Sequence, residues 1–206
     1  MKRAGSRWPG MGLLRALRGD RRGATILEFA FVAPVLILIL MFLFDTAYYL
    51  YARAILSGEV QAAGRASGLE TATQANRDAL DSGVETAVKR LVGAGNVAFT
   101  RMAYKSYGRA QSKAEAFVDG NGDGLCNNNE TFDDANANNV RDLDSGASGQ
   151  GGAKDVTIYT VTLRYNRIFP MAYLLGWPQE VTMASSTILR NQPFDKQSEP
   201  VTGNCT

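Results

Sequence analysis

The chain has 206 residues, of which 45% are hydrophobic and 9% aromatic, a composition that supports one domain with a modest core and excludes a disordered chain. It contains no histidine, which removes the usual general base near neutral pH and the commonest transition-metal ligand, so we expect a protein that is not an enzyme. Seven of the 22 Lys/Arg and one of the 20 Asp/Glu lie in residues 1–22, so the remainder is acidic, with 15 basic and 19 acidic residues. This balance argues against nucleic-acid binding by the main domain.

An apolar run follows the basic leader. Residues 29–44 are apolar without interruption, and 21 residues precede Asp45 when counted from Ala24. At about 1.5 Å per residue, such a helix spans roughly 31 Å, the thickness of the hydrocarbon core of a bilayer. The sequence therefore predicts a retained transmembrane helix. The alternative, a secretory signal peptide, lacks a small-x-small cleavage site, and an interfacial belt of tyrosines follows the run instead: Tyr48, Tyr49 and Tyr51.

Charges beside this run predict its orientation. Four arginines precede it and face the cytoplasm by the positive-inside rule: Arg15, Arg18, Arg21 and Arg22. Everything after residue 50 is then exported. Met11 offers a second translation start, which would shorten the leader.

Two helices are predicted beyond the bilayer. The first continues the anchor, is rich in small residues and ends near Gly64 or Gly68. Small residues on a helix allow a neighbouring helix to approach closely. The second follows a capping-box pattern at Thr71–Gln74, carries apolar residues at three- and four-residue spacing, and stops at Gly93.

Strands are expected in the second half of the chain. Residues 156–165 alternate and are β-branched, and 180–189 are the expected hairpin partner, with a shorter strand near 97–102. Residues 169–178, between the hairpin strands, are too apolar for an exposed loop, and are expected to form a turn packed on the sheet or a patch against membrane or partner. Residues 145–153 are rich in Gly and Ser and predict a flexible surface loop.

These elements predict an α+β fold in which a long N-terminal transmembrane helix continues into a globular domain with a second helix and a small antiparallel sheet. The predicted organisation is a basic leader at 1–23, the transmembrane and extended first helix at 24–67, and an exported domain at 68–206. The last of these contains a polar loop region at 119–144.

The first half of that loop region has the spacing of an EF-hand calcium loop. Oxygen ligands fall at positions 1, 3, 5, 7, 9 and 12, with the position-7 ligand a backbone carbonyl: Asp119, Asn121, Asp123, Leu125, Asn127 and Glu130. Gly124 occupies position 6, where the turn is sharp. This pattern predicts a structural calcium ion. The alternative is a flexible polar loop.

A poorer run of the same kind follows. Its candidate ligands are Asp134, Asn136, Asn138, Val140, Asp142 and Asp144. Asn139 stands in the glycine position, and no acid occupies position 12. The spacing between the two loops leaves no room for a full helix, so the pair resembles calcium-repeat or dockerin-like loops more than a signalling EF-hand pair.

Two cysteines, Cys126 and Cys205, lie far apart without a CxxC motif. This arrangement argues against a zinc or redox site, and in an exported domain it predicts one disulfide. The alternative is two free or intermolecularly paired thiols.

The membrane boundary carries the most specific motif. A glycine is followed by a small residue, with Glu at the fifth and Phe at the sixth place after it: Gly23, Ala24, Glu28 and Phe29. This resembles the prepilin peptidase site of the type IV pilin superfamily. The sequence of residues 21–36, followed by Tyr-Tyr-Leu-Tyr-Ala-Arg, resembles one family within this superfamily, the TadE-like minor pilins of tight-adherence (Tad) pilus systems. Residues 168–170 and 184–194 resemble the same family. Residues 105–153 have no counterpart in this resemblance.

The resemblance implies cleavage between Gly23 and Ala24 by a prepilin peptidase and pairing of Glu28 with the amino terminus of a neighbouring pilin or pseudopilin subunit. The alternative for Glu28 is that it reaches the cytoplasmic headgroups of an uncleaved anchor. The implied location is the bacterial inner membrane, single pass with a cytoplasmic N-terminus and an exported C-terminal domain, or the pilus or cell surface.

Two functions are therefore expected. The first is a minor pilin or pseudopilin, a structural component used in pilus biogenesis and surface adhesion. The second is an uncleaved, single-pass, calcium-stabilised extracellular binding module. The mature N-terminus distinguishes them.

Overall fold

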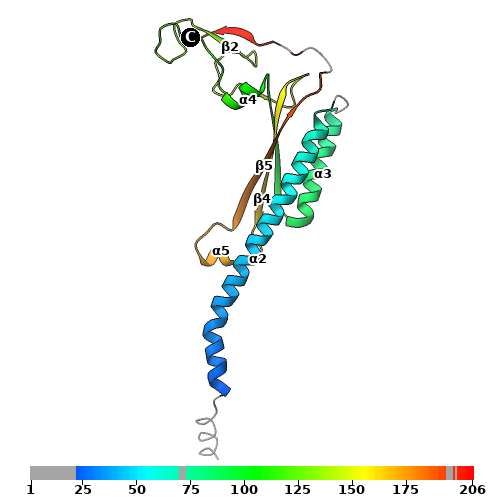
Figure 1. The fold of residues 1–206 in the computed structure, drawn as a ribbon, viewed down its shortest axis with the longest axis vertical. Helices are drawn as coiled ribbons and strands as arrows, with labels where there is room; N and C mark the ends of the chain where they lie inside the picture. The colour runs from blue at the N-terminus through cyan, green and yellow to red at the C-terminus, as the bar shows by residue number, and fades with distance from the viewer. Residues whose placement is uncertain (1–21, 70–72, 194–196, 198) are drawn as a thin grey trace, which may run out of the picture. The chain divides into compact units, whose positions relative to one another are not determined.

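The fold is taken from a computed structural model, which describes residues 22–69, 73–193, 197 and 199–206. The chain divides into two compact units, the first ending at Thr46 and the second comprising Ala47–Thr206. The predicted α+β class is confirmed (Figure 1). The elements are α2 (Arg22–Ser67), α3 (Gln74–Val92), β1 (Asn96–Tyr104), α4 (Tyr107–Ser112), β2 (Thr131–Asp134), β3 (Ala147–Ser148), β4 (Val156–Asn166), α5 (Met171–Leu174), β5 (Glu180–Arg190) and β6 (Val201–Asn204).

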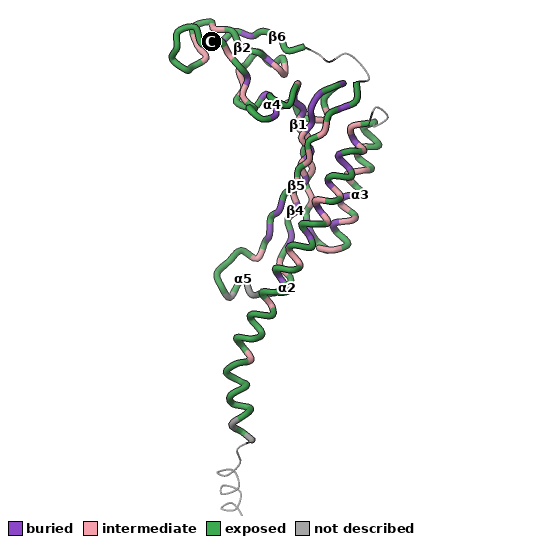
Figure 2. Tube along the Cα trace, viewed as in Figure 1, coloured by how far each residue is buried: buried purple, intermediate pink, exposed green. Residues whose placement is uncertain are grey.

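α2 is a single helix of 46 residues. Its first turns, in the first unit, expose large apolar side chains around the helix, and most of this part has the exposed colour in Figure 2. From Thr25 onward the helix is long and apolar enough to cross a membrane by length and composition. It ends at Ser67, next to the predicted stop at Gly68. The predicted membrane-spanning helix is therefore present as a candidate anchor.

The main sheet has the strand order β3-β1-β4-β5 and is antiparallel throughout the pairs that the register defines. β4 and β5 pair from Val156 opposite Arg190 to Asn166 opposite Glu180, which confirms the predicted hairpin. Buried and less buried residues alternate along β4, because successive side chains point to opposite faces of a strand.

One buried cluster joins the helices to the sheet. It comprises Ala52, Leu56, Val60 and Ala63 of α2, Val84 and Val88 of α3, Tyr159, Val161, Leu163 and Tyr165 of β4, and Val181 and Met183 of β5. Gly64 lets α2 approach β5 closely, since a Cβ there would lie 2.4 Å from Cγ2 of Thr187. The small residues of α2 thus fall into two groups. Some contact the chain's own sheet, while Ala47, Ala54, Gly58 and Ala62 are exposed.

α2 and β4 run in opposite directions within the second unit. Near the start of that unit, the rings of Tyr48 and Tyr165 meet edge to face with centroids 5.8 Å apart. Near the end of α2, Gly64 lies against Thr187 of β5, the strand that is antiparallel to β4. The turn that joins β4 to β5 therefore lies at the end of the unit where α2 enters it.

A polar network also fixes α3 on the sheet. Asp81 accepts two hydrogen bonds from the Arg101 guanidinium, both of 2.7 Å, and one of 2.6 Å from the Tyr159 hydroxyl. The guanidinium also stacks over the Tyr159 ring, 4.3 Å from its centroid. Burial first, and then the bond to Asp81, raise the pKa of Tyr159. The Asp81 carboxylate of α3 thus binds side chains of both β1 and β4.

Two predictions of local structure need correction. The N-cap of α3 is Thr73, whose hydroxyl accepts the N–H of Asn76, and not the predicted Thr71, which lies outside the described residues. The stretch 145–153, predicted to be a flexible loop, contributes the edge strand β3 and buries Ser145 and Ala153. The side-chain amide of Asn191 donates hydrogen bonds to the carbonyls of Gln150 and Gly152, at 2.8 Å each, and so holds this stretch in place. Composition does not reveal such a non-local contact.

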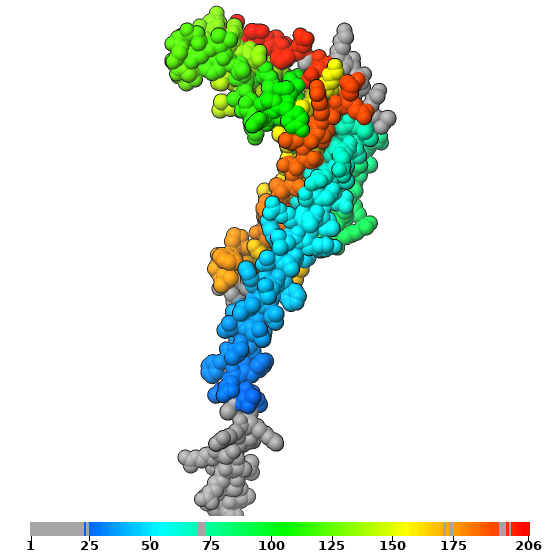
Figure 3. Space-filling view, viewed as in Figure 1, coloured from blue at the N-terminus to red at the C-terminus, as the bar shows by residue number. Residues whose placement is uncertain are grey.

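A second, two-stranded sheet pairs β2 with β6, so the C-terminal residues lie beside the polar loop region (Figure 3). Phe132 of β2 is buried, and Gly203 of β6 lies opposite it. A Cβ on Gly203 would lie 2.4 Å from the Phe132 ring, so only glycine fits there without displacement of the ring. Neither strand is predicted from the sequence.

Candidate functional site

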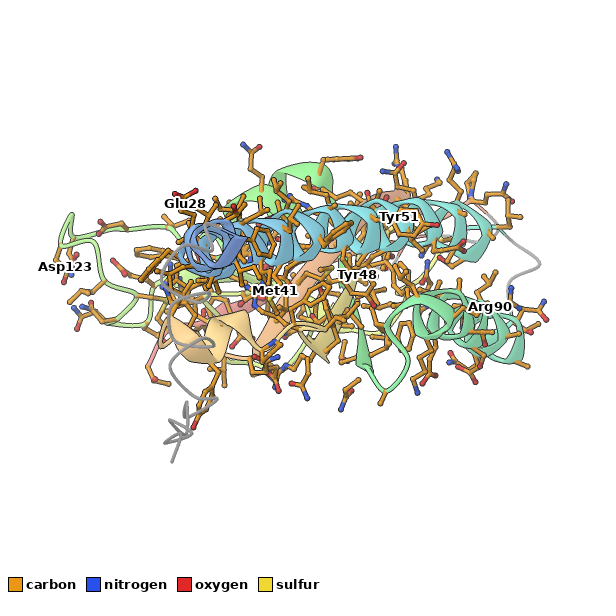
Figure 4. The ribbon with its side chains drawn as sticks, turned by 90° about the horizontal axis from the view of Figure 1, so that it is seen from below. Glu28, Met41, Tyr48, Tyr51, Arg90 and Asp123 are labelled. Carbon is orange, nitrogen blue, oxygen red and sulfur yellow. A yellow bond between two sulfur atoms is a disulfide. The ribbon has the colours of Figure 1, made fainter. Side chains whose placement is uncertain are left out.

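The residues of the predicted cleavage motif lie at the start of α2. Gly23 has no other atoms within 4 Å of where a Cβ would be, and Glu28 and Phe29 are exposed. Figure 4 shows Glu28 projecting away from the helix axis. The side chain of Ala24 and the arginines before Arg22 lie outside what the structure describes. The motif is therefore an accessible, helical segment with one carboxylate in an apolar surface.

The polar loop region forms two successive loops, and Asp119 organises the first of them. Its Oδ1 accepts the N–H groups of Gly122 at 2.6 Å and Asp123 at 3.2 Å, and its Oδ2 accepts that of Gly124 at 2.9 Å. Positions 4, 5 and 6 of the loop thus turn around the carboxylate at position 1. Gly122 and Gly124 have φ of 75° and 77°, a conformation that glycine adopts without steric cost.

Glu130 closes the first loop from position 12. Its Oε1 accepts the N–H of Gly120 at 2.7 Å, and its Oε2 accepts the N–H of Asn127 at 3.3 Å. These are positions 2 and 9 of the loop. The carboxylate therefore ties the first residues of the loop to its end.

Asp123, at position 5, lies at the outer edge of the loop (Figure 4). Its carboxylate accepts the Nδ2 groups of Asn121 and Asn127, both at 2.9 Å, and the N–H of Leu125 at 2.8 Å. The bond from Asn127, followed by that from Leu125, lowers the pKa of this carboxyl. Asp123 is therefore ionised at neutral pH.

The second loop repeats this pattern. Asp134 accepts the N–H groups of Asn138 at 3.1 Å and Asn139 at 2.8 Å, which are its positions 5 and 6, and Asn138 Oδ1 accepts the N–H of Val140 at 2.8 Å. Ala137 and Asn139 have φ of 58° and 60°, so positions 4 and 6 are left-handed here as in the first loop. The two loops therefore share the turn at positions 4 to 6 in spite of their different sequences.

Glu115 supplies the acid that the second loop lacks in sequence. Its Oε1 accepts the N–H of Ala135 at 2.8 Å and its Oε2 that of Asp142 at 3.0 Å. These are positions 2 and 9, the same two positions that Glu130 closes in the first loop. Glu115 and Asp134 are each 1% exposed. Sequence reasoning missed Glu115 because it is separated from Ala135 by 20 residues and follows no local pattern.

Asp144, a predicted ligand of the second loop, is engaged elsewhere. Its carboxylate accepts the Tyr104 hydroxyl at 2.9 Å and the N–H of Gly146 at 3.1 Å. Burial, and then this bond, raise the pKa of Tyr104 to about 12. Asp142, in contrast, accepts the Nδ2 groups of Asn136 and Asn138, so its carboxylate does lie with the loop.

A disulfide joins Cys126, within the first loop, to Cys205, as predicted; their Cα atoms are 5.3 Å apart. The N–H of Cys205 also donates to the carbonyl of Glu130 at 2.8 Å. The C-terminal strand is thus held covalently to one loop and by pairing to β2, which lies between the loops.

The fit of these loops to calcium is clearer in the backbone than in the side chains. Within the described part of the chain, no three His, Cys, Asp or Glu side chains are gathered so as to hold a metal. Several Asn side chains turn nitrogen toward the carboxylates, and rotation of these amides would turn oxygen toward them instead. The loop turns and the chemistry of the oxygen donors suit a hard cation. The side chains would have to close around it.

An unbroken helix with an exposed apolar part and a remainder packed on an antiparallel sheet is the arrangement expected of a membrane-anchored, pilin-like protein. Residues 23–65 match the family model of the TadE-like protein, which confirms over this segment the resemblance seen in the sequence. The match supports a pilin-like role associated with a Tad pilus. No curated protein and no solved structure matches the chain.

Proposed function

We propose that this protein is a minor pilin or pseudopilin of a Tad, type IV-like pilus, a structural and non-enzymatic subunit used in pilus biogenesis and surface adhesion. The observation that carries the proposal is α2. One helix, Arg22–Ser67, combines an exposed apolar part with a part that packs on the sheet, and the family match lies within it. The apolar part would anchor the subunit in the inner membrane and then in the filament.

Processing would occur between Gly23 and Ala24, and the new amino group would lie in reach of Glu28 of a neighbouring subunit. A lone carboxylate near the centre of a bilayer costs about 3 kcal/mol, and less near its edge, so a charged partner has a clear benefit. The exposure of Glu28 supports such pairing between copies.

The exposed small residues of α2 support close contact between subunits. They are Ala47, Ala54, Gly58 and Ala62. Their spacing of seven, four and four residues places them on one face of the helix. Small residues on one face allow two helices to approach closely.

Export of the second unit is supported by charge and by redox chemistry. The Lys/Arg residues concentrated in residues 1–22 favour a cytoplasmic N-terminus. The Cys126–Cys205 disulfide suits an oxidising compartment on the other side of the membrane.

The mature N-terminus tests this proposal. In cells with an active prepilin peptidase, mass spectrometry should find a chain that begins at Ala24. Gly23→Ala should leave the leader attached, because the peptidase needs glycine before the cleaved bond. Gly58→Ala is the matched control, since it makes the same change at an exposed position of the same helix with no atom within 4 Å. An intact leader on the unaltered protein would contradict processing.

Glu28→Val tests the assembly role separately. It should leave the protein in the membrane, since it adds apolar surface, and should reduce pilus output. Glu59→Val makes the same change on α2 beyond the apolar run and should leave output near normal. Normal pilus output from Glu28→Val would contradict the charge pairing.

We also propose that the two loops of residues 119–144 bind calcium as a structural ion. Asp119, Asp123 and Glu130 would serve the first loop, and Asp134, Asp142 and Glu115 the second, together with Asn and carbonyl oxygens. Glu115 supports the second site because it takes the position that the sequence leaves without an acid. Extracellular modules bind calcium with Kd of about 10⁻⁴ to 10⁻³ M, so millimolar calcium suffices.

Calorimetry with calcium chloride on the full chain in detergent tests these sites. Two binding events are expected; Glu130→Gln should weaken one and Glu115→Gln the other, and chelation should lower the melting temperature. Glu85→Gln on α3 is the control, because its carboxylate pairs only locally with Lys89 on an exposed surface. No heat at millimolar calcium, with no effect of chelator on melting, would leave the loops as self-satisfied polar turns.

A second function has one observation in its favour. The loops, β2 and β6 form a disulfide-braced region with its own sheet, which would suit an uncleaved, anchored binding module. That function predicts a membrane protein that retains its leader and needs no pilus machinery for display.

A further inference from the structure

The turn between β4 and β5, residues 167–179, is here called the hairpin tip. It contains α5 and displays four large apolar or aromatic side chains: Ile168 at 58%, Tyr173 at 82%, Leu175 at 54% and Trp177 at 53% exposure. Aromatic residues with a polar atom are typical of the interface between membrane and water. The tip contains no acidic residue, and its single charge is Arg167.

Several polar groups of the tip are hydrogen-bonded within it. The N–H of Trp177 donates to the carbonyl of Ala172 at 2.8 Å. The side-chain amide of Gln179 donates to the carbonyl of Arg167 at 2.9 Å, and the N–H of Arg167 donates to the carbonyl of Gln179 at 2.9 Å. Hydrogen bonds within the backbone, combined with exposed apolar side chains, lower the cost of entering an apolar medium.

The tip also lies at the correct end of the second unit. Tyr165, at the end of β4, contacts Tyr48 of α2, and the chain continues from Tyr165 into the tip. Tyr48 follows Phe44, the last residue of the apolar run, by four residues, about 6 Å along a helix. Because β4 runs opposite to α2, the tip lies beyond Tyr165 at the same end of the second unit as Tyr48. Figure 1 shows α5 at the end of the second unit where α2 enters it.

We propose that the hairpin tip inserts Tyr173, Leu175 and Trp177 into the headgroup region of the phospholipid bilayer that holds α2. This inference rests on the membrane anchorage in the proposed function. The bilayer is favoured over another protein because the tip lies at the end of the second unit where α2 enters it. Its Trp, its Tyr and its lack of acidic residues also suit a phospholipid surface. The tip would give the subunit a second contact with the membrane before assembly.

The test uses the full chain reconstituted in vesicles of phosphatidylethanolamine and phosphatidylglycerol, with and without bromine on the upper part of the acyl chains. The chain has two tryptophans, so Trp8→Phe leaves Trp177 as the single reporter. We expect its emission to move to shorter wavelength in vesicles and to be quenched by the brominated lipid. Tyr173→Asp, at the most exposed position, should reduce that quenching without lowering the melting temperature.

Two further single-tryptophan proteins, each carrying Trp8→Phe and Trp177→Phe, separate the possible failures. Leu38→Trp reports on the anchor and should be quenched, whereas Tyr107→Trp, exposed on α4, should not be. Quenching at residue 38 without quenching at 177 would overturn the tip proposal and leave the anchorage intact. No quenching at residue 38 would overturn the anchorage and the tip proposal with it. A blue shift at 177 that disappears when the protein-to-lipid ratio is lowered would assign the tip to contact between copies, and would also overturn the proposal.

Discussion

Asp81 is the residue on which the polar contact between α3 and the sheet depends. It is the shared acceptor of Arg101 and Tyr159, and its side chain is only 15% exposed. Removal of one partner from a buried ion pair leaves an uncompensated charge and typically costs about 3–5 kcal/mol. The lower end of this range applies to Asp81, because the pair is not fully buried.

Asp81→Ala should therefore lower the free energy of unfolding by about 3 kcal/mol in urea denaturation of the full chain in detergent. Asp78→Ala, one turn earlier on the same helix and exposed, should change it by less than about 0.5 kcal/mol. Equal losses from both substitutions would mean that helix propensity, and not the network, accounts for the effect.

Ala137 occupies a left-handed conformation, with φ of 58°. A residue other than Gly, Asn or Asp is strained there by roughly 1–2 kcal/mol. Ala137→Gly removes this strain but makes the unfolded chain more flexible, so it should stabilise the second loop by up to about 1 kcal/mol. A higher melting temperature would show this. Ala135 lies two residues earlier and has no positive φ. Ala135→Gly should therefore lower the melting temperature, since glycine there only adds freedom to the unfolded chain.

At the scale of elements, the C-terminal strand β6 depends on its covalent bond. It is four residues long and, among the strands that the structure describes, pairs only with the equally short β2. A two-stranded ribbon of this size is marginal by itself. The disulfide closes a sequence separation of 79 residues, which restricts the unfolded chain by roughly 4 kcal/mol on the entropy model.

Cys205→Ser should consequently release β6 and expose the β2 amides to hydrogen exchange, while those of β4 stay protected as the internal reference. The double variant Cys126→Ser with Cys205→Ser should behave like the single one, since both lose the same bond. If β2 stays protected in both variants, pairing and the packing of Gly203 on Phe132 hold the ribbon without the bridge.

The long helices α2 and α3 and the β4–β5 hairpin could be predicted, because the local sequence shows their hydrophobic periods. The short helices α4 and α5 were not predicted. Alternation over 156–165 can bury one face only as a strand, and an apolar run from 29 to 44 has few alternatives to a spanning helix. The ribbon of β2 and β6 could not be predicted, because four residues such as Thr131–Asp134 contain no usable period. β3 was missed for the same reason, in a segment whose composition favours loops.

The loop region could likewise be predicted only in part. The position-1 acids, Asp119 and Asp134, and the closing acid Glu130 were visible in the spacing, and the structure gives all three the expected hydrogen bonds within their loops. The role of Glu115 was not visible, because it comes from a contact made only after folding. A search for an acid missing at position 12 would have identified the gap but not the residue that fills it.

At the scale of the whole molecule, buried tyrosines make the second unit sensitive to alkali. Burial and the bond to Asp144 raise the pKa of Tyr104 from 10.0 to about 12. Below pH 10 this tyrosine is protonated in the folded and the unfolded chain. Between pH 10 and 12 the unfolded chain loses the proton first, so stability falls as the pH rises. At about 1.4 kcal/mol per pKa unit, Tyr104 contributes a loss of roughly 3 kcal/mol over this interval.

Urea denaturation at pH 9 and pH 11.5 measures this loss. Tyr104→Phe keeps the ring and removes the hydroxyl, so it should reduce the decline with pH while lysine titration remains the same in both proteins. An unchanged decline in Tyr104→Phe would assign the alkaline sensitivity to other groups, of which Tyr159 is the first candidate, because its pKa is also raised.

The antiparallel course of α2 and β4 has a mechanical consequence. Tension that enters the second unit through its first helical turns acts along the helix axis, and therefore nearly parallel to the strands on which Ala52–Gly64 pack. The contacts of that interface then share the load in shear, and no single contact is peeled off ahead of the others. A subunit pulled by its anchor, as in an extending or retracting filament, would resist extraction with its whole core at once.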